Sequence, residues 1–114
     1  MFVAMNRFRV IPERANDFEA TWLKRESYLH EMEGFMTFQL LRGAEKPDHV
    51  LFSSYTLWRT RQHFDAWVQS AQFAASHKRA GNSQPTIIGH PEFEGFDVIQ
   101  QLEAHAPKQP ETVR

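Results

Sequence analysis

Hydrophobic and polar positions alternate over the first ten residues, which is the period of a strand with one buried face. That face carries four apolar side chains and one amide, namely Phe2, Ala4, Asn6, Phe8 and Val10. Arg7 and Arg9 fall on the opposite face. Pro12 then ends the strand, because proline cannot donate a hydrogen bond to a sheet.

The spacing changes to that of a helix over roughly residues 13–32. Phe18, Trp22, Arg25 and Leu29 recur at intervals of four, three and four residues, which places them on one helix face. Asn16 is followed three residues later by Glu19, which fits a capping box and would place the start of the regular helix later.

The middle of the chain predicts a hairpin followed by a second helical stretch. Gly34 interrupts the helical pattern, residues 35–42 and 50–58 are typical of strands, and the turn between them holds Gly43 and Pro47. Thr60 is a plausible helix cap, and the apolar stripe after it consists of Phe64, Trp67, Val68, Ala71 and Ala75. Residues 81–85 indicate a loop, and residues 87–99 a last strand interrupted by Pro91 and Gly95.

This order, β-α-β-β-α-β, predicts an α+β ferredoxin-like fold, an antiparallel sheet with two helices on one face. We expect one domain over residues 1–102 and a flexible C-terminal tail over residues 103–114, which is mostly polar and holds two prolines. The other sheet face would lie bare in a monomer. Because the chain has many large apolar residues, we expect a homodimer that covers this face.

Composition excludes several classes of protein. The 114 residues fit one domain, and no apolar stretch of about 18 residues predicts a membrane span. The net charge is −1 without a long basic run, so nucleic acid is not an expected partner. The chain has no cysteine, and charges interrupt its apolar N-terminus, unlike a signal peptide. The expected location is therefore the cytoplasm.

Familiar catalytic motifs are also missing. No pair among the six histidines has the H-x-x-x-H spacing, and no acidic cluster accompanies them. The chain has no serine elbow, P-loop or dinucleotide fingerprint. We infer that its reactivity comes from a ligand.

Two residues in the apolar stripes admit two interpretations each. Asn6 is either a core amide bonded to a neighbouring backbone group, which the strand alone favours, or a donor that points into a pocket. Without a partner it would cost about 1–3 kcal/mol. Trp67 is either an ordinary core aromatic, which its spacing favours, or a pocket wall for a planar ligand.

His77 does not fit an unbroken second helix. Counting from Phe64, His77 and Phe73 would lie opposite the apolar stripe, so His77 would be exposed. Alternatively, the helix breaks near Ser70 and a short second helix over residues 72–79 turns Phe73 and His77 toward a pocket together. Neutral imidazole is a good ligand for heme iron.

The chain resembles the heme-degrading monooxygenases of the antibiotic biosynthesis monooxygenase superfamily, the IsdG-like and MhuD-like bacterial enzymes. The resemblance runs from about residue 2 to 98. It depends on Asn6 in the first strand, GFMTFQLLRG at 34–43, FDAWVQS at 64–70 and FAASHKRA at 73–80.

The resemblance implies a dimeric α+β barrel and O2-dependent cleavage of heme, with electrons from a reductase or a small-molecule reductant. Heme is both substrate and cofactor, and the products are iron and a biliverdin-like tetrapyrrole. By resemblance His77 binds the heme iron, Asn6 hydrogen-bonds the oxygen ligand, and Trp67 presses on the porphyrin. Trp22, Arg25 and Phe73 are expected to line the heme site. Arg25 is the expected contact for a propionate, the alternative being an exposed arginine in a salt bridge.

Two other functions remain open at this point. A cofactor-independent monooxygenase of the same fold, acting on a quinol or polyketide, would need no iron ligand. A heme-binding carrier without turnover would have a similar binding site. Stoichiometric hemin binding, seen by absorbance, would distinguish a heme enzyme from the cofactor-independent monooxygenase. Decay of the heme absorbance under O2 with a reductant would distinguish a heme-degrading enzyme from a carrier.

Overall fold

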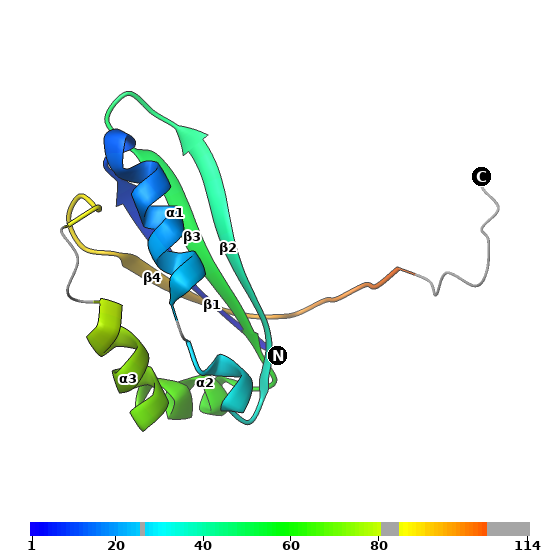
Figure 1. Ribbon diagram of the computed structural model, residues 1–114. Helices are drawn as coiled ribbons and strands as arrows, with labels where there is room; N and C mark the ends of the chain where they lie inside the picture. The colour runs from blue at the N-terminus through cyan, green and yellow to red at the C-terminus, as the bar shows by residue number, and fades with distance from the viewer. Residues whose placement is uncertain (26, 81–84, 105–114) are drawn as a thin grey trace, which may run out of the picture.

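The computed structural model describes residues 1–25, 27–80 and 85–104, with only the backbone described for residues 76–80. Figure 1 shows a curved sheet with α1 packed lengthwise over one face and α2 and α3 beside its lower end. None of the helices in these ranges has the length and apolar character needed to cross a bilayer.

The sheet confirms the predicted fold class. Its strands are β1 (Phe2–Val10), β2 (Phe35–Glu45), β3 (Val50–Trp58) and β4 (Glu92–Asp97). They lie in the order β2-β3-β1-β4, and every neighbouring pair is antiparallel. This is the ferredoxin-like arrangement, in which the first and third strands occupy the centre.

The first helix is shorter than predicted. A 3-10 turn, η1 (Pro12–Arg14), leads into α1 (Ala15–Lys24), and a second 3-10 turn, η2 (Leu29–Glu31), follows. The chain leaves the helix at Arg25, whose backbone is extended, and Tyr28 has a left-handed backbone with φ 61°. Leu29 therefore reaches the core from a separate turn and not from the helix stripe.

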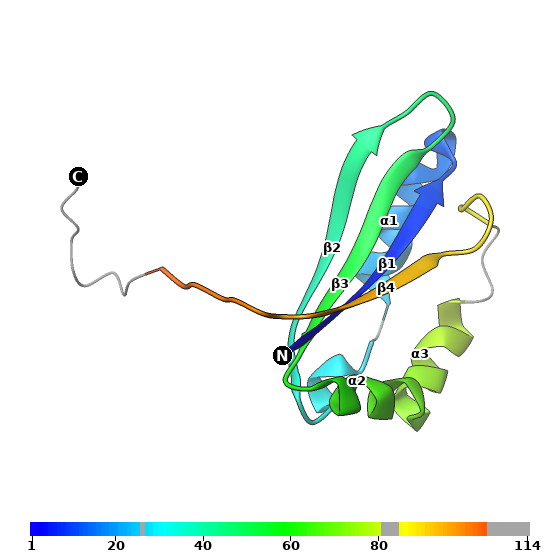
Figure 2. The same cartoon turned by 180° about the vertical axis from the view of Figure 1, so that it is seen from behind.

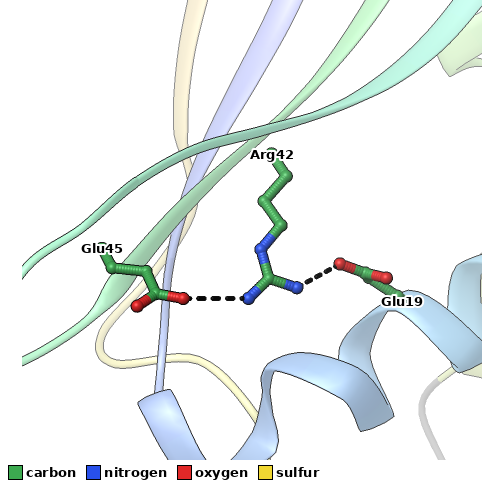
Figure 3. Close-up of polar contacts among 3 residues, drawn as sticks. All are labelled: Glu19, Arg42 and Glu45. Atoms are coloured by element: carbon green, nitrogen blue, oxygen red, sulfur yellow. Dashed lines mark hydrogen bonds and ion pairs between the residues drawn. The ribbon is translucent and has the colours of Figure 1, made fainter.

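The predicted capping box is wrong. Arg14 precedes α1 without a side-chain cap, and Asn16 lies inside the first turn. The Glu19 carboxylate instead accepts a 2.5 Å hydrogen bond from Arg42 of β2, whose other amino group lies 3.3 Å from Glu45 (Figure 3). The hydrogen bond to Glu19 raises the pKa of Arg42 and connects α1 to the sheet edge.

The second helical stretch is two helices, which is the second of the two alternatives that the position of His77 left open. Thr60 caps α2 (Arg61–Val68) by accepting a 3.2 Å hydrogen bond from the His63 backbone N–H. α3 (Ala71–Ala80) begins after a break at Gln69 and Ser70. The Ser70 hydroxyl donates to the Trp67 carbonyl oxygen at 2.6 Å and accepts from the Phe73 N–H at 3.0 Å. One side chain thus ends one helix and begins the next.

The last strand is also shorter than residues 87–99. A single bridge joins Ile87 to Val10, and pairing resumes only at Glu92, after Gly89 (φ 74°) and Pro91. After β4 the chain runs away from the domain, as Figures 1 and 2 show, and Ile99 is 95% exposed. Most of the loop predicted at 81–85 and of the tail predicted at 103–114 lies outside the described residues.

The core consists of two apolar clusters on the helix-facing side of the sheet. One is built around Trp58 and Trp67 near α2, and the other around Val10 and Phe52 under α1. The two clusters lie toward opposite ends of β1 and β3, and the middle of these strands separates them.

The other face of the sheet has no helix over it, and Figure 2 shows it toward the viewer with α1 behind. Its side chains include Val3, Met5, Tyr55 and Leu57, all partly exposed, and Phe96, which is 45% exposed. This is the apolar face expected in the monomer. The homodimer that would cover it stays a prediction.

The turn before β2 requires glycine at position 34. Gly34 has φ 84°, and a Cβ placed there would overlap the ring of His63. Gly34→Ala should lower the free energy of unfolding by at least about 1–2 kcal/mol, the cost of a left-handed backbone alone. Urea unfolding measures it. Gly43→Ala is the control, because its Cβ would lie 3.4 Å from the nearest atoms. An equal effect of the two substitutions would contradict this account.

Candidate functional site

A cavity of about 720 Å³ lies between the sheet and the helices, in the gap between the two core clusters. The middle of β1 and β3 forms its floor, α1 with the following turn forms one side, and α2 and α3 form the other. Five of the six predicted site residues line it: Asn6, Trp22, Arg25, Trp67 and Phe73. This volume is within the range of small-molecule sites.

Asn6 lies on the floor of this cavity. In the register of the sheet it is opposite Ser54 of β3 on one side and Phe93 of β4 on the other. Among the hydrogen bonds of the described residues, none involves the Asn6 amide. A core amide would have bonded a neighbouring backbone group. The amide is instead free to donate into the cavity.

Trp67 is a core aromatic that also lines the cavity, and its contact with a planar ligand stays a prediction. It is 7% exposed and belongs to the core cluster, where its ring lies 6.3 Å from that of Trp58. It also lines the cavity, together with Phe73 of α3. The rings of Trp67 and Phe73 meet at 83°, with centroids 5.3 Å apart. This wall of the cavity is therefore continuous with the core.

The α1 side of the cavity presents an indole and a guanidinium. The Trp22 ring stacks on Phe38 of β2, with centroids 5.8 Å apart and an angle of 14°. The Arg25 guanidinium carbon lies 4.3 Å from the centre of the Trp22 ring. Burial lowers the pKa of Arg25, although an arginine this far from neutral pH keeps its charge.

Arg25 gives the cavity a single positive charge. Of the described residues that line it, only Arg25 is ionisable, and no carboxylate is present. Arg25 forms no ion pair within the described ranges, so the alternative of an exposed arginine in a salt bridge is wrong. A partly buried cation without a counter-charge favours an anionic ligand. The cavity thus suits a flat, largely apolar molecule that carries a carboxylate.

His77 is the one predicted site residue whose placement stays untested. It lies on α3, one helical turn after Phe73, but its side chain is outside the described residues. The helix break on which its prediction depended is present. Its contact with a ligand remains a prediction.

The structure adds cavity residues that the sequence did not single out. They are Phe38 and Phe93 from the two edge strands, Phe64 of α2, and Ser54 and Thr56 of β3. Phe93 stacks on Phe64 at 5.6 Å. Ser54 and Thr56 carried a usable signal, because they are polar residues on the apolar face of their strand, as Asn6 is.

The fold and the cavity define the class of this protein, a small ferredoxin-like α+β domain with an aromatic cavity between its sheet and helices. A profile of the antibiotic biosynthesis monooxygenase family matches residues 1–79. The chain belongs to this family. A search of the curated proteins found no match.

Solved structures of similar fold include proteins with different chemistry. The heme-degrader MhuD from Mycobacterium tuberculosis, solved with two hemes in its active site, is 24% identical, with a TM-score of 0.71 over 90% of this chain and 100% of that one. The cofactor-independent oxygenase SnoaB from Streptomyces nogalater, solved as a point mutant, is 20% identical, with a TM-score of 0.65 over 89% and 95%. These likenesses show the fold.

Proposed function

We propose that the protein binds heme in this cavity and cleaves its porphyrin ring with O2 and electrons from an external donor. The products would be iron and a biliverdin-like tetrapyrrole. The observation that carries the proposal is the combination of an aromatic cavity with one cation, Arg25, and an amide, Asn6, that bonds no described residue.

The described residues fit a porphyrin. Its flat apolar ring matches the aromatic side chains of the two walls, and its carboxylates match Arg25, which the cavity leaves without a counter-charge. His77, on α3 beyond Phe73, would hold the iron. The break before α3 turns the start of this helix toward the cavity, since Phe73 lines it.

Heme, when bound, supplies the iron that activates oxygen. The protein would orient the heme and the reacting oxygen relative to each other. Arg25 would bind a propionate, and Trp67, which Trp58 and Phe73 hold in place, would press on the porphyrin plane and bend it. Asn6 would donate one hydrogen bond from the floor of the cavity and so direct the reacting oxygen to one edge of the ring.

Cofactor-independent oxidation of a quinol or polyketide is the second candidate. The fold is also similar to that of SnoaB, and a planar phenolic acid would suit the same walls and the same arginine. This reaction needs no iron ligand, so it leaves His77 without a role.

A hemin titration separates the two candidates. Hemin should bind stoichiometrically with a sharp Soret band, and the band should decay when O2 and a reductant are added, even with catalase present. Mass spectrometry identifies the product. Absence of stoichiometric binding would contradict the proposal and favour the second candidate. Binding without decay would indicate a heme carrier.

Asn6→Ala should retain hemin binding but slow its degradation by about 10²-fold, the usual cost of losing one donor aimed at a reacting oxygen. Hemin affinity and the initial rate of Soret decay measure the two effects. Asn16→Ala is the matched control, because Asn16 is an exposed amide on α1 away from the cavity. A normal degradation rate in Asn6→Ala would remove its assigned role.

A further inference from the structure

Ser54 lies directly opposite Asn6 in the β1–β3 register, and both side chains line the cavity. Ser54 is only 8% exposed. Its neighbours on the same face of the sheet include Phe52 and Leu40, which are apolar, and Thr56, whose hydroxyl is bonded. A serine in the centre of a sheet packs less surface than the β-branched and aromatic residues that favour this position. Packing alone does not explain Ser54.

The hydroxyl of Ser54 has no hydrogen-bond partner among the described residues, whereas the hydroxyls next to it in β3 are bonded. Ser53 donates to the Ser54 carbonyl oxygen at 3.3 Å. Thr56 accepts from Trp58 Nε1 at 2.9 Å and donates to the Ala4 carbonyl oxygen at 3.4 Å. The Ser54 oxygen is not among the fully buried polar atoms, and it faces the cavity, so it is open to a partner at the cavity floor.

Asn6 is the side chain within reach. Residues directly opposite in an antiparallel pair have Cβ atoms about 4.5–5.5 Å apart. A serine hydroxyl and an asparagine amide at this separation meet after rotation about side-chain bonds alone. Both groups are unbonded within the described part of the chain, so no existing hydrogen bond has to break.

We propose that Ser54 is a positioning residue for Asn6. When the cavity is filled, its hydroxyl donates to Asn6 Oδ1, and the amide then presents its NH2 group to the ligand. Without a donor at Oδ1, the amide can turn over and offer its oxygen instead. This inference rests on the proposed function, because the group that would receive the NH2 hydrogen bond is the oxygen that the bound heme activates.

Substitutions at Ser54 separate positioning from packing. Ser54→Ala should slow Soret decay by about fivefold, the effect of one neutral hydrogen bond. It should leave the thermal midpoint unchanged or higher, because the hydroxyl is unbonded in the structure. Ser54→Thr, which keeps the hydroxyl, should degrade hemin faster than the isosteric Ser54→Val. Ser53→Ala is the control, because Ser53 is equally buried but on the opposite face of β3.

The double variant tests whether Ser54 acts through Asn6. Asn6→Ala with Ser54→Ala should degrade hemin no more slowly than Asn6→Ala alone, since coupled residues are not additive.

The infrared C–O stretch of the carbon monoxide complex of reduced hemin-protein provides a readout independent of turnover. Ser54→Ala should shift it in the same direction as Asn6→Ala, and Ser53→Ala should not shift it.

An unchanged rate and C–O stretch in Ser54→Ala, in a wild-type protein that binds and degrades hemin, would overturn the role of Ser54 alone. Multiplied rate losses in the double variant would also overturn it. A wild-type protein that does not bind hemin would overturn the proposed function and this inference together.

Discussion

Replacing His77 with alanine should abolish both the tight binding of hemin and its degradation. In the proposed function, His77 is the ligand of the heme iron. We expect hemin affinity to fall by more than about 100-fold, because even outer-shell substitutions at metal sites cost about 10- to 100-fold. Absorbance titration and the rate of Soret decay measure the two losses.

The two-helix arrangement is the physical basis of this prediction. In a continuous helix, Phe73 and His77 would lie opposite the apolar stripe of α2. The break at Ser70 changes the direction of the chain, and Phe73 then lines the cavity against Trp67. His77 follows four residues later on the same helix, which places it near the same face.

Two controls sharpen the result. His30→Ala removes an exposed imidazole from η2 and should bind hemin as the wild-type protein does. His77→Gly with added imidazole should recover the Soret band, because free imidazole can occupy the vacated position. Wild-type affinity and spectrum in His77→Ala would show that another group binds the iron.

Trp58→Ala should destabilise the fold more than Gly34→Ala does. Trp58 is 0% exposed, and its ring lies within 5.7–6.3 Å of those of Phe35, Phe64 and Trp67. Its Nε1 donates to Thr56. The expected loss is about 3–5 kcal/mol, the usual range for truncating a buried tryptophan. Domains of this size have about 5–15 kcal/mol in total.

Urea unfolding, followed by circular dichroism, measures this loss. Leu23→Ala is the control, because Leu23 is 84% exposed on α1 and its truncation should change stability by less than about 0.5 kcal/mol. A loss below about 1 kcal/mol in Trp58→Ala would mean that its cavity refills and that the core tolerates repacking.

Local periodicity predicted the elements that have one buried face. The alternation in residues 2–10 identified β1 and its apolar side, and the misfit of His77 with the Phe64 stripe raised a break between α2 and α3 as one of two alternatives. The prediction failed after Lys24, where the helical spacing continues but the backbone does not. Leu29 keeps its buried role there through a turn with a left-handed Tyr28, which spacing alone cannot reveal.

Residues of the candidate site could be predicted from the sequence where a polar side chain falls on an apolar face. Asn6 is such a residue, and Ser54 is a second that was not singled out from the sequence. Phe38 and Phe93 carry no local signal, because their place at the cavity depends on strand pairing over long separations. Glu19 was misjudged for the same reason, since its partner Arg42 lies on another element.

The Ser70 hydroxyl bonds backbone atoms on both sides of it, and so it fixes the perpendicular corner between Trp67 and Phe73 before any ligand arrives. A flat molecule that lies against one of these rings must turn its rim toward the other. The two rings are therefore preorganised to select flat ligands in one orientation. A ligand ring would lose rotational entropy on binding, but the two side chains would not have to rearrange.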